Sequence, residues 1–98
     1  MSTPGSLDSL TRAVEAMHRC KAKHKSAGFV HEMIDGKTVW KGNVDTFTLS
    51  GHPKATRAFA WAYRDETGEV QYLAVLNVPP INSPSEAVQA AIASGNQR

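Results

Sequence analysis

The sequence predicts an α+β fold in which a four-stranded antiparallel sheet is flanked by one helix at each end of the chain, in the order α-β-β-β-β-α. Two observations predict it. Strand-like apolar runs surround turn residues in the middle of the chain, and apolar residues at helical spacing lie near both ends. Strands joined by short turns form a meander. We therefore expect residues 1–98 to be one domain, with residues 1–5 and 96–98 as flexible tails.

The aromatic stretch from Arg57 to Pro80 is the strongest strand signal. Phe59, Trp61 and Tyr63 alternate with alanines, so the rings share one face of a strand and the alanines share the other. Helical spacing of the alanines offers a second interpretation, but the strict alternation favours a strand. Residues 65–68 have turn chemistry, and the following run is apolar on both faces until the two prolines end it.

The N-terminal helix is predicted over residues 7–24, with Ser6 as its N-cap and apolar residues at helical spacing behind it. Its end is basic, and Gly28 is an available stop. The ordinary interpretation is a set of cations that complement the helix dipole. The alternative is a patch that binds phosphate or an acidic partner. The cations of this basic patch are Arg19, Lys21, Lys23 and Lys25.

Two further strands are expected between the first helix and the aromatic stretch. One covers residues 28–34, and Asp35-Gly36 is a hairpin turn signal. The other covers residues 38–49, where Gly42-Asn43 suggests a bulge or a bend because both residues are poor strand formers.

The last helix has the clearest boundaries, over residues 82–95. Ser83 is the expected N-cap, Pro84 takes the first helical position, and Glu86 completes a capping box. Gly95 is the expected stop.

Two helices packed side by side are about as wide as a four-stranded sheet, so both could cover one face and leave the other face exposed to solvent. An aromatic face without cover exceeds what a monomer usually exposes, and we therefore expect a homodimer. The alternative is that the sheet curls or the helices divide between its faces, so that the rings are core. The rings could also line an apolar pocket for a ligand. The candidate ligand or interface residues are Trp40, Phe59, Trp61, Tyr63 and Tyr72.

The net charge, the cysteine content and the length of the apolar segments restrict the class of protein. The net charge of +2 is too small to indicate nucleic-acid binding, although residues 1–57 carry +4 and residues 58–98 carry −2. The single cysteine, Cys20, cannot form an internal disulfide, and neither a signal peptide nor a membrane span is recognisable. A cytoplasmic location without membrane contact is expected.

No catalytic motif is present, and we expect no catalytic residue, cofactor or metal. The best polar cluster is a candidate anion-binding loop, made by His52, Lys54 and Arg57. An exposed loop without function is the ordinary interpretation, and a small enzyme that uses His52 is the least favoured one. On the predicted helix Cys20 and His24 would lie one turn apart, but two ligands do not make a zinc site.

Several short phrases of the chain occur together: Trp40-Lys-Gly, Gly51-His-Pro-Lys-Ala, Ala60-Trp61, Val78-Pro-Pro and Ser83-Pro. With them, residues 40–94 resemble small uncharacterised bacterial proteins, some of which are associated with mobile gene cassettes. The resemblance implies a bacterial cytosolic setting, and it assigns no catalytic residue to this chain. The element order is also similar to that of the double-stranded-RNA-binding domain, but the basic motif expected at the start of the last helix is missing.

The function expected from the sequence is therefore a non-catalytic homodimer that binds a small molecule or a protein partner through its sheet. The alternative is a protein that binds nucleic acid or an acidic partner through the basic end of the first helix.

Overall fold

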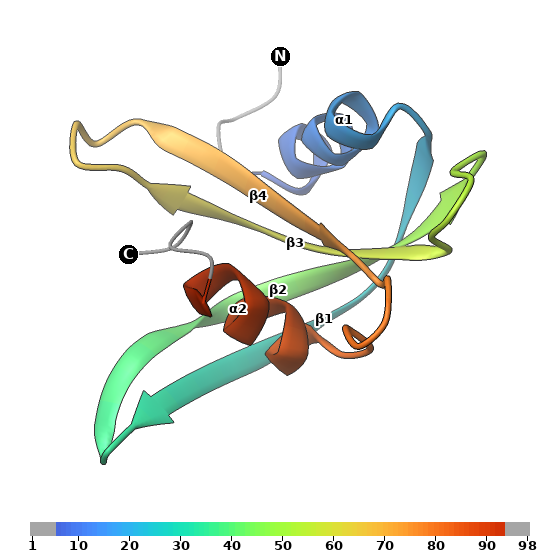
Figure 1. Ribbon diagram of the computed structural model, residues 1–98. Coiled ribbons are helices and arrows are strands. Elements are labelled where there is room, and N and C mark those ends of the chain that lie inside the picture. The colour runs from blue at the N-terminus through green and yellow to red at the C-terminus, as the bar shows by residue number, and fades with distance from the viewer. Residues whose placement is uncertain (1–5, 94–98) are drawn as a thin grey trace.

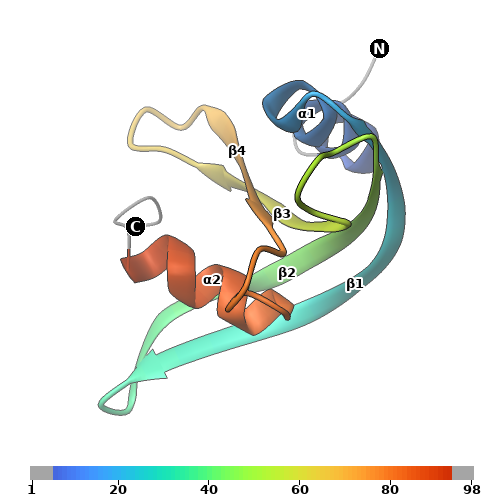
Figure 2. The same cartoon turned by 45° about the vertical axis from the view of Figure 1, so that its right-hand side comes forward.

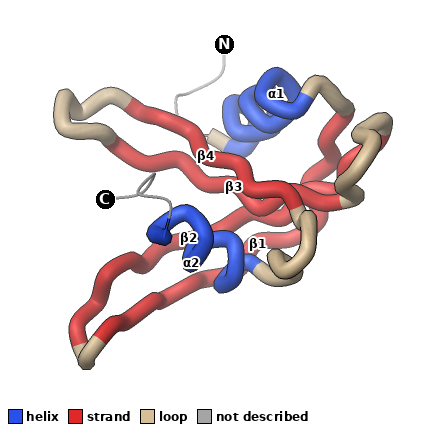
Figure 3. Tube along the Cα trace, viewed as in Figure 1, coloured by secondary structure: helices blue, strands red, loops and turns tan. Residues whose placement is uncertain are grey.

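The computed structural model describes residues 6–93, so the predicted tails and the stop at Gly95 lie outside the described residues. It contains one antiparallel sheet with the strand order β1-β2-β3-β4 and a helix at each end, which confirms the predicted α-β-β-β-β-α order. The elements, shown in Figures 1 and 3, are α1 (Leu7–His18), β1 (Lys21–Ile34), β2 (Lys37–Ser50), β3 (Arg57–Arg64), β4 (Val70–Leu76) and α2 (Pro84–Ala93).

α1 begins as predicted but ends earlier. The Ser6 side chain accepts a hydrogen bond from the Ser9 N–H at 3.2 Å, as an N-cap does. The helix stops at His18, Arg19 adopts a left-handed conformation (φ 51°), and β1 starts at Lys21. The predicted helix over residues 7–24 is therefore wrong at its C-terminal end. The reason lies in the alternation of residues 21–25, where exposed lysines alternate with partly buried residues as in a strand.

β1 and β2 form a long hairpin around the predicted turn at Asp35 and Gly36. Both turn residues have positive φ (52° and 77°), as a two-residue hairpin loop with the right twist requires. Gly42-Asn43 is not a bulge, because both residues pair regularly with β1. The register shifts instead at Lys25 and at Val39. Gly42 has a packing role, since a Cβ there would lie 3.2 Å from the Trp40 ring.

β3 and β4 form the predicted hairpin, and the helical interpretation of the aromatic stretch is excluded. The turn is organised by Asp65, whose carboxylate accepts hydrogen bonds from Thr67, Glu69 and Gln71. The side-chain bonds from Thr67 and Gln71 are the main reason why the pKa of Asp65 falls from 3.8 to about 2.

This turn should make folding sensitive to acid. A carboxyl group whose pKa is lower in the folded state stabilises the fold above its unfolded pKa, and that contribution disappears as the pH falls from about 4 to about 2. We expect thermal unfolding of the wild type to move to lower temperature over this range by more than that of Asp65→Asn, which cannot titrate. Equal shifts in the two proteins would contradict this role for Asp65.

The two helices lie on opposite faces of the sheet, which corrects the expectation that both would cover one face (Figure 2). On one face, Leu10 and Val14 of α1 pack over the alanines of β3, and Ala58 and Ala60 are completely buried. On the other face, α2 packs over the aromatic residues of β3. The alanine side of β3 is small because α1 must approach the sheet there.

β2 pairs with β3 over only four residues, from Asp45 to Thr48. Beyond Val44 the β1–β2 hairpin departs from β3, and α2 lies in the opening between the two hairpins (Figure 1). Ala87, Val88 and Ala91 are the buried residues of α2. The predicted cap of this helix is present, since Ser83 Oγ accepts from the Glu86 N–H at 3.2 Å.

Candidate functional site

The aromatic face of β3 is core rather than exposed surface. Phe59 and Trp61 are 3% and 2% exposed beneath α2, and the Trp61 ring packs edge-to-face on Trp40 with a centroid distance of 5.5 Å. Tyr63 and Trp40 are partly buried at the margin of the same cluster. These rings therefore need no cover from a second molecule, as in the alternative in which the helices divide between the faces.

Tyr72 lies on the other face. It pairs with Ala62 on β3, and residues that face each other across a ladder share a face. Tyr72 therefore belongs with Ala74 and Leu76 in the cluster under α1. The predicted set of five aromatic residues is thus divided between two faces, because the sequence gives the alternation within a strand but not the register between strands.

The free edge of β4 is the clearest candidate surface for a partner. Hydrogen bonds from Asn77 to Arg57 (3.0 Å) and from Asp65 to Glu69 (3.0 Å) fix which residues pair with β3. These are the odd-numbered ones, so the backbone N–H and C=O groups of the even-numbered residues of β4 point away from β3. Every residue of β4 is partly buried, and none is charged.

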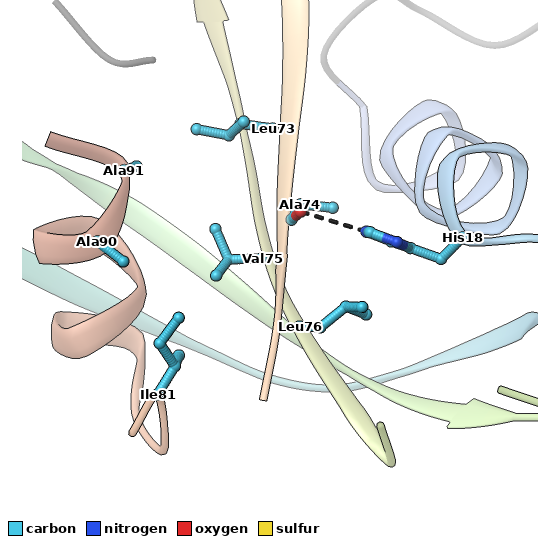
Figure 4. Close-up of a pocket in the computed structure, with 8 residues that line it drawn as sticks. All are labelled: His18, Leu73, Ala74, Val75, Leu76, Ile81, Ala90 and Ala91. Atoms are coloured by element: carbon cyan, nitrogen blue, oxygen red, sulfur yellow. Dashed lines mark hydrogen bonds between the residues drawn. The ribbon is translucent and has the colours of Figure 1, made fainter. Parts of the chain in front are cut away.

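A groove of about 330 Å³ follows this edge (Figure 4). Leu73 and Val75 point toward α2, while Ala74 and Leu76 point toward α1. His18 reaches from the end of α1, and its Nε2 lies 3.2 Å from the carbonyl oxygen of Ala74. The groove therefore combines apolar side chains with outward-pointing backbone groups, which is the surface that an additional strand recognises.

A second cavity, of about 400 Å³, lies between α2 and the tip of the β1–β2 hairpin. The sequence did not indicate it, because its walls meet only when α2 lies against this hairpin. Met33, Ile34 and Val39 are 53%, 56% and 42% exposed there, and the Gln89 amide donates to the Glu32 carboxylate at its rim. Several exposed apolar side chains around one cavity are typical of a surface that contacts a partner.

In the predicted anion-binding loop, one ring nitrogen of His52 is used within the loop itself. The Nδ1 atom of His52 accepts hydrogen bonds from the backbone N–H groups of Lys54 (3.1 Å) and Ala55 (3.0 Å). These two backbone donors are therefore not free for an anion, and binding of an anion by the Lys54 and Arg57 side chains stays a prediction. The backbone N–H of Arg57 donates to Asn77 Oδ1, and its side chain belongs to another surface, described next.

The predicted basic patch is divided by the structure, because Arg19 is the C-cap of α1, Lys25 lies at a register shift, and Lys21 and Lys23 lie on β1. Lys23 pairs with Thr48, and Thr48 pairs with Arg57. All three therefore lie on the same face of three neighbouring strands, and all are exposed. Lys21 pairs with Ser50 two residues further along the same face. The structure thus places Arg57, from the predicted anion site, beside two members of the predicted basic patch.

A hydrogen-bonded pair that the sequence did not indicate joins β1 and β2. His24 Nε2 lies 2.9 Å from Asp45 Oδ1, and the His24 ring packs edge-to-face on Phe47. The two residues are 21 positions apart in the sequence, and only the pairing register of β1 and β2 brings them together. Among residues 6–93, no serine, threonine or cysteine side chain is hydrogen-bonded to this pair.

Cys20 shows no sign of activation. Burial, and secondly the negative charge of Glu15, raise the pKa of the thiol, which keeps it protonated at neutral pH. No group of three or more His, Cys, Asp or Glu side chains within the described residues could hold a metal ion. The expected absence of a cofactor stays a prediction.

Comparison with protein-family models, with curated proteins and with solved structures finds no match to this chain. Neither α1 nor α2 has the length and apolar character needed to cross a membrane. The function must therefore be inferred from the surfaces described above.

Proposed function

We propose that the protein is a non-catalytic homodimer that binds through its sheet, and that the dimer forms where the β4 edges of two copies meet. The observation that supports this proposal is the free edge of β4, which is uncharged, partly buried along its length and bordered by an apolar groove. Exposed edges of soluble proteins usually carry charge or proline as protection against pairing, and β4 carries neither.

A second copy fits this edge because β4 is complementary to itself. A two-fold axis at Ala74 places Tyr72 opposite the partner's Leu76 and Leu73 opposite the partner's Val75 in an antiparallel ladder. These pairs bring no like charges together. The Ala74 carbonyl can accept from His18 and from the partner strand at once, because a carbonyl oxygen has two lone pairs.

The dimer would join two four-stranded sheets into one continuous sheet. Small domains bury a limited share of their surface, and association adds to it. The groove beside β4 and the cavity at the hairpin tip are the places where a small molecule or a protein partner would then bind. A bacterial cytosolic setting, which the lone Cys20 and the resemblance favour, belongs to the same proposal.

Proline at position 74 is the sharpest test of this interface. The Ala74 N–H points away from β3, so Ala74→Pro removes a donor of the edge without removing a hydrogen bond of the β3–β4 ladder. We expect the wild type to have the mass of a dimer by light scattering at micromolar concentration, and Ala74→Pro to have the mass of a monomer with its circular dichroism spectrum retained.

Ala74→Ser is the matched control, because it changes the same residue and keeps the backbone N–H. This variant should remain a dimer. A wild-type chain that stays monomeric at several hundred micromolar would contradict the proposal. So would a folded Ala74→Pro variant that dimerises as well as the wild type.

A further inference from the structure

We propose that the exposed face of the sheet around the row Lys23–Thr48–Arg57 binds the phosphate backbone of nucleic acid without sequence preference. This surface goes beyond the proposed dimer and lies elsewhere on the sheet. Neighbouring strands are about 4.8 Å apart, so Lys23 and Arg57 flank Thr48 with their Cα atoms about 10 Å from each other. Lys21 and Ser50 extend the surface by one further pair.

The positive charge of this surface is uncompensated. Within residues 6–93, no ion pair involves Lys21, Lys23 or Arg57. The nearest acidic residue along β2 is Asp45, which lies on the opposite face and pairs with His24. The Arg57 backbone is held by Asn77 Oδ1 at 3.1 Å, so the guanidinium projects from a fixed point. Three exposed cations, Lys21, Lys23 and Arg57, therefore share one face of the sheet, with Thr48 between Lys23 and Arg57.

Phosphate fits these residues better than a carboxylate-bearing peptide does. Phosphate oxygens in nucleic-acid complexes accept hydrogen bonds from arginine, lysine and hydroxyl groups. Here the hydroxyl group of Thr48 lies between Lys23 and Arg57, and that of Ser50 lies beside Lys21. Arginine adds a planar donor pair that matches phosphate geometry.

Phe59 and Trp61, which lie on the same face of β3 as Arg57, are buried beneath α2 and cannot stack on bases. The exposed ring of Phe29 pairs with Asn43 and therefore lies on the opposite face of the sheet. Contacts would therefore be to the backbone, and base identity would have little effect.

The location of the row separates this proposal from the dimer. Lys21 and Lys23 lie on β1, at the edge of the sheet opposite to β4. Pairing of two β4 edges leaves β1 exposed in each copy. A dimer would therefore carry two such surfaces, and a monomer would carry one.

The test uses fluorescence anisotropy of a labelled oligothymidine of 20 nucleotides, titrated with the full chain over a series of salt concentrations. Three phosphate contacts predict that the logarithm of the association constant falls against the logarithm of salt with a slope of about −2. Lys23→Gln and Arg57→Gln should each weaken binding and make the slope shallower by about 0.7. The control is Lys41→Gln, which removes the same charge from an exposed position elsewhere on β2.

Three results would overturn the proposal. The first is no binding at about 20 mM salt, where electrostatic affinity is greatest. The second is an equal loss of affinity in Lys41→Gln. The third is displacement of the oligonucleotide by a polyglutamate peptide of equal charge at the same concentration as by unlabelled oligothymidine, which would identify an acidic peptide as the partner. Thermal unfolding of each variant verifies that it is folded, and light scattering of the same samples tests the dimer separately.

Discussion

Replacing Trp61 by alanine should lower the free energy of unfolding by about 3–5 kcal/mol, the range for removal of a large aromatic side chain from a packed core. Trp61 is 2% exposed and is the largest of the completely buried side chains. Its ring packs on Trp40 and belongs to the cluster that holds α2 on the sheet. A domain of this size has a total stability of about 5–15 kcal/mol, so the variant should be close to unfolding at 37 °C.

Urea denaturation followed by far-ultraviolet circular dichroism measures this effect. Trp40→Ala is the matched control, because it removes a side chain of the same size from the same contact at a partly exposed position. Its loss of stability should be clearly smaller. If Trp61→Ala cost no more than Trp40→Ala, the Trp61 ring would not lie in the enclosed position described here.

The order of elements could be predicted because the local signals agree with the tertiary structure. The Asp35-Gly36 turn, the alternation of Phe59 and Trp61, and the Ser83 cap each act through neighbouring residues and need no distant contact. The predicted C-terminal end of α1 was wrong because lysines at alternate positions are compatible with two structures. They fit the basic end of a helix and also the exposed side of a strand. Only the pairing of residues 21–25 with β2 decides between the two.

The distribution of helices between the two faces could not be read from the sequence. In the sequence, the alternating Ala58 and Ala60 give no sign that a helix covers their face of the strand. Small side chains are nevertheless what a closely packed helix such as α1 requires. The prediction of an aromatic dimer interface assumed that both helices cover the same face of the sheet and leave the aromatic face exposed. Once α1 covers the alanines, α2 is available to cover Phe59 and Trp61.

The candidate surfaces show the same limit. The apolar character of β4 was visible in the sequence, and its position at the edge follows from the meander. The row Lys23–Thr48–Arg57 was not visible, because it depends on two registers at once. His52 appeared to be a free polar group, but its ring is used within its own loop. Residue type indicates which chemistry is available, while register decides which side chains meet.

Phe47→Ala should have an effect of similar size, about 3–5 kcal/mol, on the opposite face of the sheet. Phe47 is completely buried under α1, where it joins Leu10 and Val14 in one cluster. α1 is held on the sheet by this cluster, and α2 is held by the cluster around Trp61. Phe47→Ala should therefore lower the stability of the whole domain and, in addition, weaken the attachment of α1. Amide hydrogen exchange should accelerate in α1 more than in α2, under conditions in which the variant is still folded.

Phe47→Leu is the control for this prediction, since it keeps an apolar side chain in the cluster and should retain most of the stability. The comparison also tests the central feature of the fold, a sheet with one helix on each face. If both helices covered the same face, removal of Phe47 would affect them equally. Equal acceleration of amide exchange in α1 and α2 would therefore contradict the two-sided arrangement, whereas acceleration confined to α1 agrees with it.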